Sequence, residues 1–141
     1  MASFTSLLGE VRRCTLCSEH LPLGPRPILQ LHPRARILIA GQAPGRKVHE
    51  SGVPFADASG DRLRDWLGLA PEDFYDAQAH HLPDAGASVT SVVQSWREHW
   101  PSVVPLPHPS PRNNLWLRRN PWFEEDLLPR LRARVAEVLK D

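Results

Sequence analysis

The sequence predicts a single α/β domain over residues 1–141, with helices on both faces of a short parallel sheet in a three-layer αβα arrangement. Two apolar runs, Ile37–Ala40 and Ser102–Leu106, have the composition of buried parallel strands. Segments with the apolar spacing of amphipathic helices precede, separate and follow these runs. A chain of 141 residues is long enough for one modest core and too short for two.

Four segments carry apolar side chains at helical spacing, and each is expected to form a helix. They are residues 4–13, 62–67, 89–96 and 123–140. Ser59 is expected to cap the second helix, and Gly68 to end it. Pro101 ends the third helix, and an acidic first turn after Pro121 favours the start of the fourth.

The remaining segments are expected to be loops. Residues 42–59 are predicted to form a long loop after the first strand, and residues 70–86 a loop with a possible turn of helix. The 15 prolines favour short elements joined by long connections.

Composition is that of a soluble globular domain, because 41% of the residues are hydrophobic and 23% are charged. No apolar run approaches the roughly 18–20 residues that span a bilayer, and the N-terminus has no secretory signal pattern. We therefore expect a cytoplasmic protein without a membrane partner. The net charge of +1 neither requires nor excludes nucleic acid. Arg112, Arg118 and Arg119 are either phosphate contacts or part of a solvated surface.

Two short motifs follow the predicted strands. The first motif is Gly41-Gln42-Ala43-Pro44-Gly45, which continues to Gly52-Val53-Pro54-Phe55. The second motif is His108-Pro109-Ser110-Pro111. In open α/β sheets, ligands bind at the carboxyl ends of the strands, so both motifs are expected to line one site. Backbone N–H groups in a turn of this kind can hold a carbonyl oxygen or a water molecule.

The two motifs together resemble motifs 1 and 2 of the uracil-DNA glycosylase superfamily. Cys14-x-x-Cys17 and Asn120-Pro121-Trp122-Phe123 resemble the ends of its iron–sulfur branch. The resemblance implies that fold, and an enzyme of base-excision repair that hydrolyses the N-glycosidic bond of uracil or another deaminated base. It also implies an intracellular, nucleoid-associated monomer whose partner is DNA with an extruded base.

The resemblance assigns a role to each motif residue. It implies that His108 donates a hydrogen bond to O2 of the base as the bond breaks, and that Phe55 stacks on the extruded base. The other residues that would bind the base are Gly41, Ala43, Pro44, Gly45 and His49. Gln42 or Asp57 would hold the attacking water. The residues that would contact DNA are Ser110, Arg112 and Asn113.

Simpler interpretations of the same residues remain open. In the simpler interpretation, His108 is a surface histidine in a proline-rich loop and Phe55 is a core aromatic. Asp57 is then a solvated carboxylate, or one that caps a turn.

The sequence differs from the family pattern in three respects. Gln42 occupies the place of an acidic residue, and an amide cannot take a proton from water. The resembling branch holds a [4Fe–4S] cluster with four cysteines, whereas this chain has only Cys14 and Cys17. The interval between the motifs is much shorter than in the family, which indicates an internal deletion of strands and of a base-reading segment.

Three functional hypotheses follow. The first is an active DNA glycosylase, and the second is a catalytically inactive DNA-binding remnant of that family. The third is a small C-x-x-C module, with Cys14 and Cys17 as a redox pair or as half of a zinc site that His20 and His32 complete.

Overall fold

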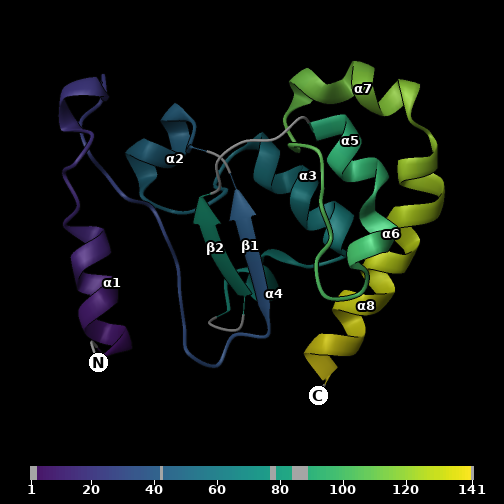
Figure 1. Ribbon diagram of the computed structural model, residues 1–141, viewed down its shortest axis with the longest axis horizontal. Helices are drawn as coiled ribbons and strands as arrows, with labels where there is room; N and C mark the ends of the chain where they lie inside the picture. The colour runs from purple at the N-terminus through teal and green to yellow at the C-terminus, as the bar shows by residue number, and fades with distance from the viewer. Residues whose placement is uncertain (1–2, 42, 77–78, 84–88, 141) are drawn as a thin grey trace.

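The computed structural model describes residues 3–41, 43–76, 79–83 and 89–140 of the chain (Figure 1). It begins with helix α1 (Phe4–Arg12) and the short 3-10 helix η1 (Ser18–His20). The elements that follow are β1 (Ile37–Gly41), α2 (Arg46–Ser51), α3 (Ala58–Leu67), α4 (Pro71–Phe74), β2 (Ala79–Pro83), α5 (Val89–Gln94), α6 (Trp96–His99), η2 (Pro111–Asn113), α7 (Asn114–Arg119), η3 (Phe123–Leu127) and α8 (Leu128–Lys140).

A parallel pair of strands lies at the centre of the fold. β1 pairs with β2 in a register that runs from Ile37 opposite Ala79 to Gly41 opposite Pro83. These two strands form the whole sheet in the part of the chain that is described. The chain therefore combines helices with a short parallel pair, and the complete three-layer arrangement stays a prediction.

Two sequence expectations about strands were wrong. Residues 70–88 were expected to hold no strand, yet β2 lies there and obtains its hydrogen-bond partners from β1. Its Ala-His-His-Leu-Pro sequence has no apolar run that would mark it. Conversely, the run 102–106 is not a strand. Pro105 and Pro107 lack the N–H groups that a strand ladder requires.

The predicted helices are present, with adjusted ends. α1 and α3 agree with the expectation. Residues 89–96, expected to be one helix, contain the whole of the short helix α5 and the first residue of α6. The last helix begins as the π-helical turn η3 and continues as α8. The expected loop 42–59 contains α2. The residue that caps the C-terminal end of this helix, Gly52, has the left-handed conformation (φ 73°). The N-terminal cap of α3 is Asp57 and not Ser59, because the Asp57 carboxylate accepts the free N–H groups of the first turn.

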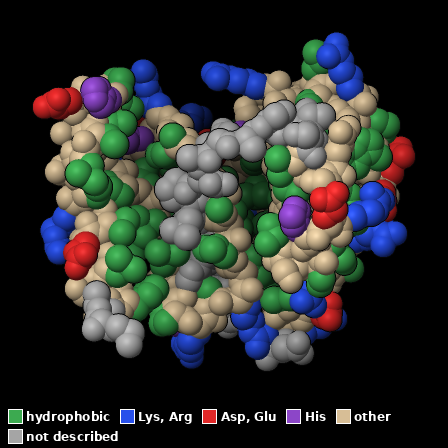
Figure 2. Space-filling view, viewed as in Figure 1, with side chains coloured by type: hydrophobic (Ala, Val, Ile, Leu, Met, Phe, Trp, Pro, Cys, Tyr) green, Lys and Arg blue, Asp and Glu red, His purple; other side chains and the backbone are tan. Residues whose placement is uncertain are grey.

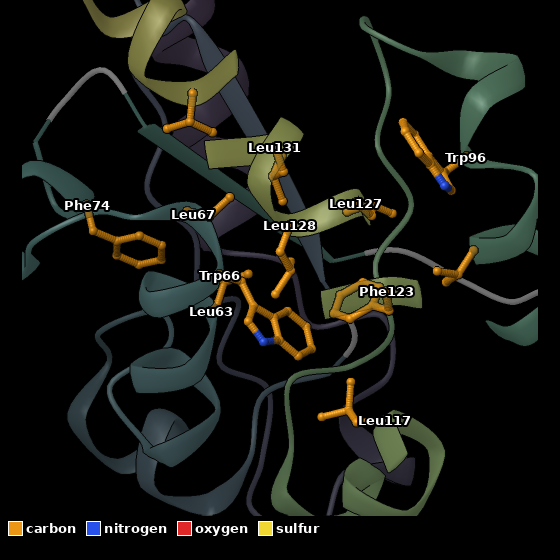
Figure 3. Packing of buried hydrophobic residues seen from close by; sticks show 12 residues of the cluster. Leu63, Trp66, Leu67, Phe74, Trp96, Leu117, Phe123, Leu127, Leu128 and Leu131 are labelled. Carbon is orange, nitrogen blue, oxygen red and sulfur yellow. The ribbon is translucent and has the colours of Figure 1, made fainter. Parts of the chain in front are cut away.

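The hydrophobic core lies between α3 and the C-terminal elements η3 and α8 (Figure 3). Trp66 of α3 packs edge-on against Phe123, with ring centroids 4.9 Å apart, and both side chains are buried. Ile37 and Ile39 of β1 pack against this core from one face of the strand pair. Leu38 points to the other face, where its side chain is 59% exposed. The helices therefore cover one face of β1 more fully than the other.

The tryptophans were expected to serve packing, and the structure agrees. Trp66 and Trp96 are buried, and Trp100, Trp116 and Trp122 pack against the core. α1 stands apart from this core and buries none of its side chains (Figure 1). Among the described residues, no helix has both the length and the apolar character needed to cross a membrane.

Truncation of Phe123 tests whether the α3–η3 contact carries the core. Phe123 is fully buried, so Phe123→Ala leaves a cavity and should lower the free energy of unfolding by about 3–5 kcal/mol. Leu115→Ala is the matched control, because Leu115 is 54% exposed and should change stability by less than about 0.5 kcal/mol. Urea unfolding followed by tryptophan fluorescence measures both. Equal losses for the two variants would contradict this assignment of the core.

Candidate functional site

Both motifs lie at the carboxyl end of the strand pair. β1 ends at Gly41, and the chain then passes through exposed residues 43–45 into α2. In Figure 1 the strand arrows point toward the end of the molecule that carries α2 and α7, and the second motif immediately precedes η2 and α7. Gln42 lies outside the described residues, so its predicted contact with water stays a prediction.

Phe55 has a backbone conformation that side-chain-bearing residues seldom adopt. Its φ is 55°, and it is the one described residue other than glycine with a positive φ. Its ring lies over the end of β1, because a Cβ on Gly41 would be 3.1 Å from the ring's Cζ. On another side it meets Phe74 edge-on, with centroids 6.2 Å apart. The ring is therefore half-buried at the mouth of the first motif.

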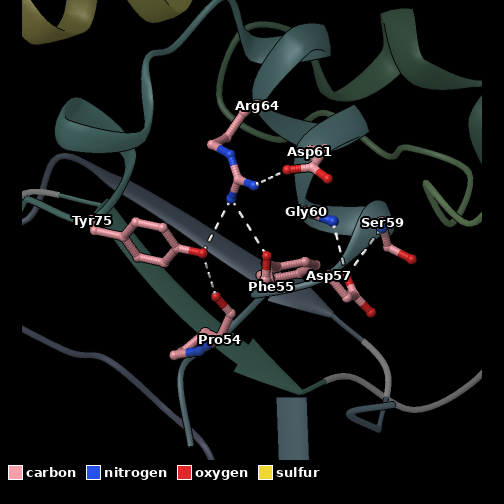
Figure 4. A network of polar contacts seen from close by, with 8 residues as sticks. All are labelled: Pro54, Phe55, Asp57, Ser59, Gly60, Asp61, Arg64 and Tyr75. Atoms are coloured by element: carbon pink, nitrogen blue, oxygen red, sulfur yellow. Dashed lines mark hydrogen bonds and ion pairs between the residues drawn. The ribbon is translucent and has the colours of Figure 1, made fainter. Parts of the chain in front are cut away.

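The turn around Phe55 is held by polar contacts from α3 and from the residue after α4 (Figure 4). The Tyr75 hydroxyl donates to the Pro54 carbonyl at 3.0 Å. Arg64 Nη1 donates to the Phe55 carbonyl at 3.4 Å and to the Tyr75 hydroxyl at 3.1 Å. Its other nitrogen, Nη2, lies 2.6 Å from the Asp61 carboxylate. Neither Arg64 nor Tyr75 stands out in the sequence, because helical periodicity carries no signal for contacts to a distant turn.

Asp57 connects the first motif to α3. Its Oδ1 accepts from the backbone N–H groups of Ser59 and Gly60, each at 3.0 Å. Its Oδ2 lies on the side of Gly45, where an added Cβ would be 3.6 Å away. Asp57 therefore caps α3 through Oδ1, while its Oδ2 faces the turn of the first motif at Gly45.

His108 is oriented by the residues that follow it. The backbone N–H of Ser110 donates to His108 Nδ1 at 3.2 Å, and the Asn113 side chain donates to the His108 carbonyl at 2.7 Å. Because Nδ1 accepts a hydrogen bond, the neutral imidazole carries its proton on Nε2. The flanking Pro107 and Pro109 are buried, which restricts the loop on both sides of the ring.

The second motif is also tied to α3. Arg62 Nη1 donates to the Ser110 carbonyl at 3.1 Å. The Ser110 hydroxyl accepts from the N–H of Arg112 at 3.2 Å and so caps η2. Asn113 is engaged with the His108 carbonyl, whereas the Arg112 side chain is exposed. Arg62 likewise carries no signal in the sequence for this contact.

His49 lies against the N-terminal segment. Its Nε2 is 3.1 Å from the Leu23 carbonyl oxygen. Arg26 of the same segment donates to the carbonyls of His49 and Glu50 near the end of α2, where helix carbonyls lack an intrahelical partner. The predicted contact of His49 with a base stays a prediction, and its observed partner is a backbone carbonyl.

The cysteines do not provide a complete metal site. Cys14 is half-buried, Cys17 is exposed, and both are free thiols. Within the described ranges, no three or more histidine, cysteine or acidic side chains are grouped so that they could hold a metal ion. A [4Fe–4S] cluster needs four thiolates in the usual case, and two cysteines do not fit it.

Basic side chains surround the carboxyl end of the strands. Arg46 and Lys47 at the start of α2 are exposed, as are Arg112, Arg118 and Arg119 around α7. Figure 2 shows Lys and Arg side chains on both sides of a notch at this end of the molecule. A surface cavity of about 330 Å³ between α3 and α7 has two basic residues in its lining, Arg62 and Arg118, together with two acidic ones, Asp65 and Glu124. Exposed basic side chains are therefore found on two segments that follow the motifs, at the start of α2 and around α7.

Comparison with known protein families assigns the sequence to a family. A sequence model described as the uracil DNA glycosylase superfamily matches residues 29–102, which is more than half of the 141-residue chain. The matched range contains β1, the first motif and α3, and it ends before His108. The chain belongs to the uracil DNA glycosylase superfamily.

Proposed function

We propose that this chain hydrolyses the N-glycosidic bond of uracil, or of another deaminated base, in DNA. Membership of the superfamily supports a DNA glycosylase-type function in general, with DNA as the substrate. The observation that carries the finer proposal is the hydrogen bond from the Ser110 N–H to His108 Nδ1, which leaves an Nε2–H donor at the site. The hydrogen bond from Arg62 to the Ser110 carbonyl fixes the position of that donor relative to α3.

The reaction requires stabilisation of the departing base. A glycosylase extrudes the nucleotide, and the sugar gains oxocarbenium character as the C–N bond breaks. Negative charge then grows on the base, and a fixed donor aimed at that charge lowers the barrier. His108 Nε2–H is suited to this role because its other nitrogen is already satisfied by the backbone.

Phe55 and Asp57 supply the remaining functions of the proposed site. The Phe55 ring provides a stacking surface at the end of β1, where the base would lie. Asp57 holds α3 through Oδ1 and offers Oδ2 to a water molecule near Gly45. An amide at position 42 orients water without deprotonating it, so Asp57 is the carboxylate proposed to activate the nucleophile.

Removal of the His108 imidazole should abolish most of the cleavage. His108→Ala should slow uracil release from a labelled oligonucleotide by about 10²–10³-fold, the usual effect of losing one donor to a developing negative charge. His99→Ala on α6 is the control, because His99 is exposed and belongs to neither motif. Unchanged cleavage by His108→Ala would refute the role of His108. A folded wild-type protein that binds DNA without cleaving it would favour the inactive remnant.

Two substitutions of Asp57 separate capping from catalysis. Asn caps a helix about as well as Asp, so Asp57→Asn should leave the melting temperature nearly unchanged. Asp57→Ala should lose about 1 kcal/mol of stability because the N–H groups of Ser59 and Gly60 lose their acceptor. Both variants should release uracil more slowly, since neither has a carboxylate. Full activity in Asp57→Asn would show that this residue acts only as a cap.

The basic residues of α2 should contribute to DNA affinity through phosphate contacts. Each such contact adds about 0.7–0.9 to the slope of log K against log salt concentration. The double variant Arg46→Gln/Lys47→Gln should therefore reduce that slope by about 1.4–1.8 in fluorescence anisotropy titrations. Arg134→Gln/Lys140→Gln removes the same charge from α8, near the opposite end in Figure 1, and should leave the slope unchanged. Equal effects would indicate a general charge effect instead of a local contact.

A further inference from the structure

We infer that Arg64 and Tyr75 are positioning residues for Phe55, and that together they hold its ring in the orientation needed to stack on an extruded base. The inference deepens the proposed function and rests on it. It is carried by the contacts of the Pro54–Phe55 turn, to which Arg64 and Tyr75 come from separate segments of the chain (Figure 4).

Phe55 needs such a restraint because its backbone lies in the left-handed region. With φ at 55°, its Cβ is crowded against the neighbouring carbonyl, and an L-residue relaxes to negative φ unless the surroundings prevent it. A change of φ would swing the ring away from Gly41 and the end of β1. The place of the stacking surface therefore depends on two backbone torsions of one residue.

The two donors restrain both of these torsions. The Pro54 carbonyl belongs to the peptide plane before Phe55, and the Tyr75 hydroxyl holds it at 3.0 Å. The Phe55 carbonyl belongs to the plane after it, and Arg64 Nη1 holds that one at 3.4 Å. Fixing the plane on each side of a residue fixes its φ and its ψ. The pair thus acts on Phe55 through the carbonyl oxygens of the two peptide planes that flank it.

The donors are themselves held in place. The Arg64 side chain is 11% exposed and lies over the rings of Phe74 and Tyr75, at 5.3 and 5.6 Å from their centroids. Its Nη2 is paired with the Asp61 carboxylate, one turn earlier on α3. The Tyr75 hydroxyl accepts from Arg64 and donates to Pro54, so its proton has one direction. The Tyr75 carbonyl accepts from the Gln30 side chain at 2.9 Å, which anchors the segment after α4.

A double-mutant cycle tests the inference. Tyr75→Phe removes only the hydroxyl, and it should lower kcat for uracil release about fivefold, the equivalent of one hydrogen bond, with KM changed less than twofold. In a Phe55→Ala background the same substitution should change kcat less than twofold, because no ring remains to be positioned. Equal losses in both backgrounds, or no loss in the wild-type background, would overturn the inference.

Conservative variants of Arg64 provide the second arm. Arg64→Lys keeps the charge but cannot reach two acceptors and an acidic partner in one plane, so it should reproduce the kcat loss of Tyr75→Phe. Arg130→Lys is the matched control, since Arg130 also pairs with an aspartate on a helix and should leave kcat unchanged. A loss of kcat in Arg130→Lys equal to that in Arg64→Lys would overturn the inference.

NMR separates this inference from the proposed function. The backbone chemical shifts of Phe55 should report the left-handed conformation in the wild type and move away from it in Tyr75→Phe and Arg64→Lys. If the wild type releases no uracil and these shifts still move, the proposed function fails while the restraint on Phe55 stands. Unchanged shifts in both variants would overturn the restraint itself.

Discussion

The close approach of Gly60 to the Phe55 carbonyl determines how the first motif meets helix α3. A Cβ on Gly60 would lie 1.7 Å from that oxygen, so every other residue type would push the turn and the helix apart. The N–H of Gly60 also donates to Asp57, which starts the helix at the same place. Because α3 begins against the turn, the ring of Phe55 is carried over the end of β1.

Helix α3 joins this contact to the rest of the molecule. One face carries Leu63, Trp66 and Leu67 into the core, where Trp66 meets Phe123. Its other residues reach both motifs, with Arg64 on the Phe55 carbonyl and Arg62 on the Ser110 carbonyl. The burial that stabilises α3 therefore also sets the relative position of the two motifs. A proposed reaction that needs a stacking ring and a hydrogen-bond donor together depends on this one helix.

The segment between the motifs has two structural tasks. β2 gives β1 a parallel partner, and Tyr75, shortly before it, supports the turn of the first motif. The strand pair is narrow, and Leu38 remains exposed on the face away from the core. The α3–η3–α8 packing, together with Phe74 and Trp96, forms a core that does not require a wide sheet. The site is thus supported mainly by helices, with the strands providing its floor.

The sequence by itself determined the features that local patterns encode. Apolar spacing gave α1, α3 and α8, an apolar run gave β1, and the motif residues gave the family, which the match over residues 29–102 confirms. Tertiary structure decided what depends on distant partners. β2 has no apolar run and is a strand because β1 pairs with it, whereas residues 102–106 have the apolar run and no strand pairing.

The same distinction holds within the candidate site. His108, Phe55 and Asp57 could be singled out from short motifs, although the capping role of Asp57 emerged only where its carboxylate meets two backbone N–H groups. Arg64 and Tyr75 carry no local signal, because their partners are backbone carbonyls 9 and 21 residues away. Periodicity and motifs report neighbours along the chain. Hydrogen bonds and close contacts between separate segments exist only after the core has brought those segments together.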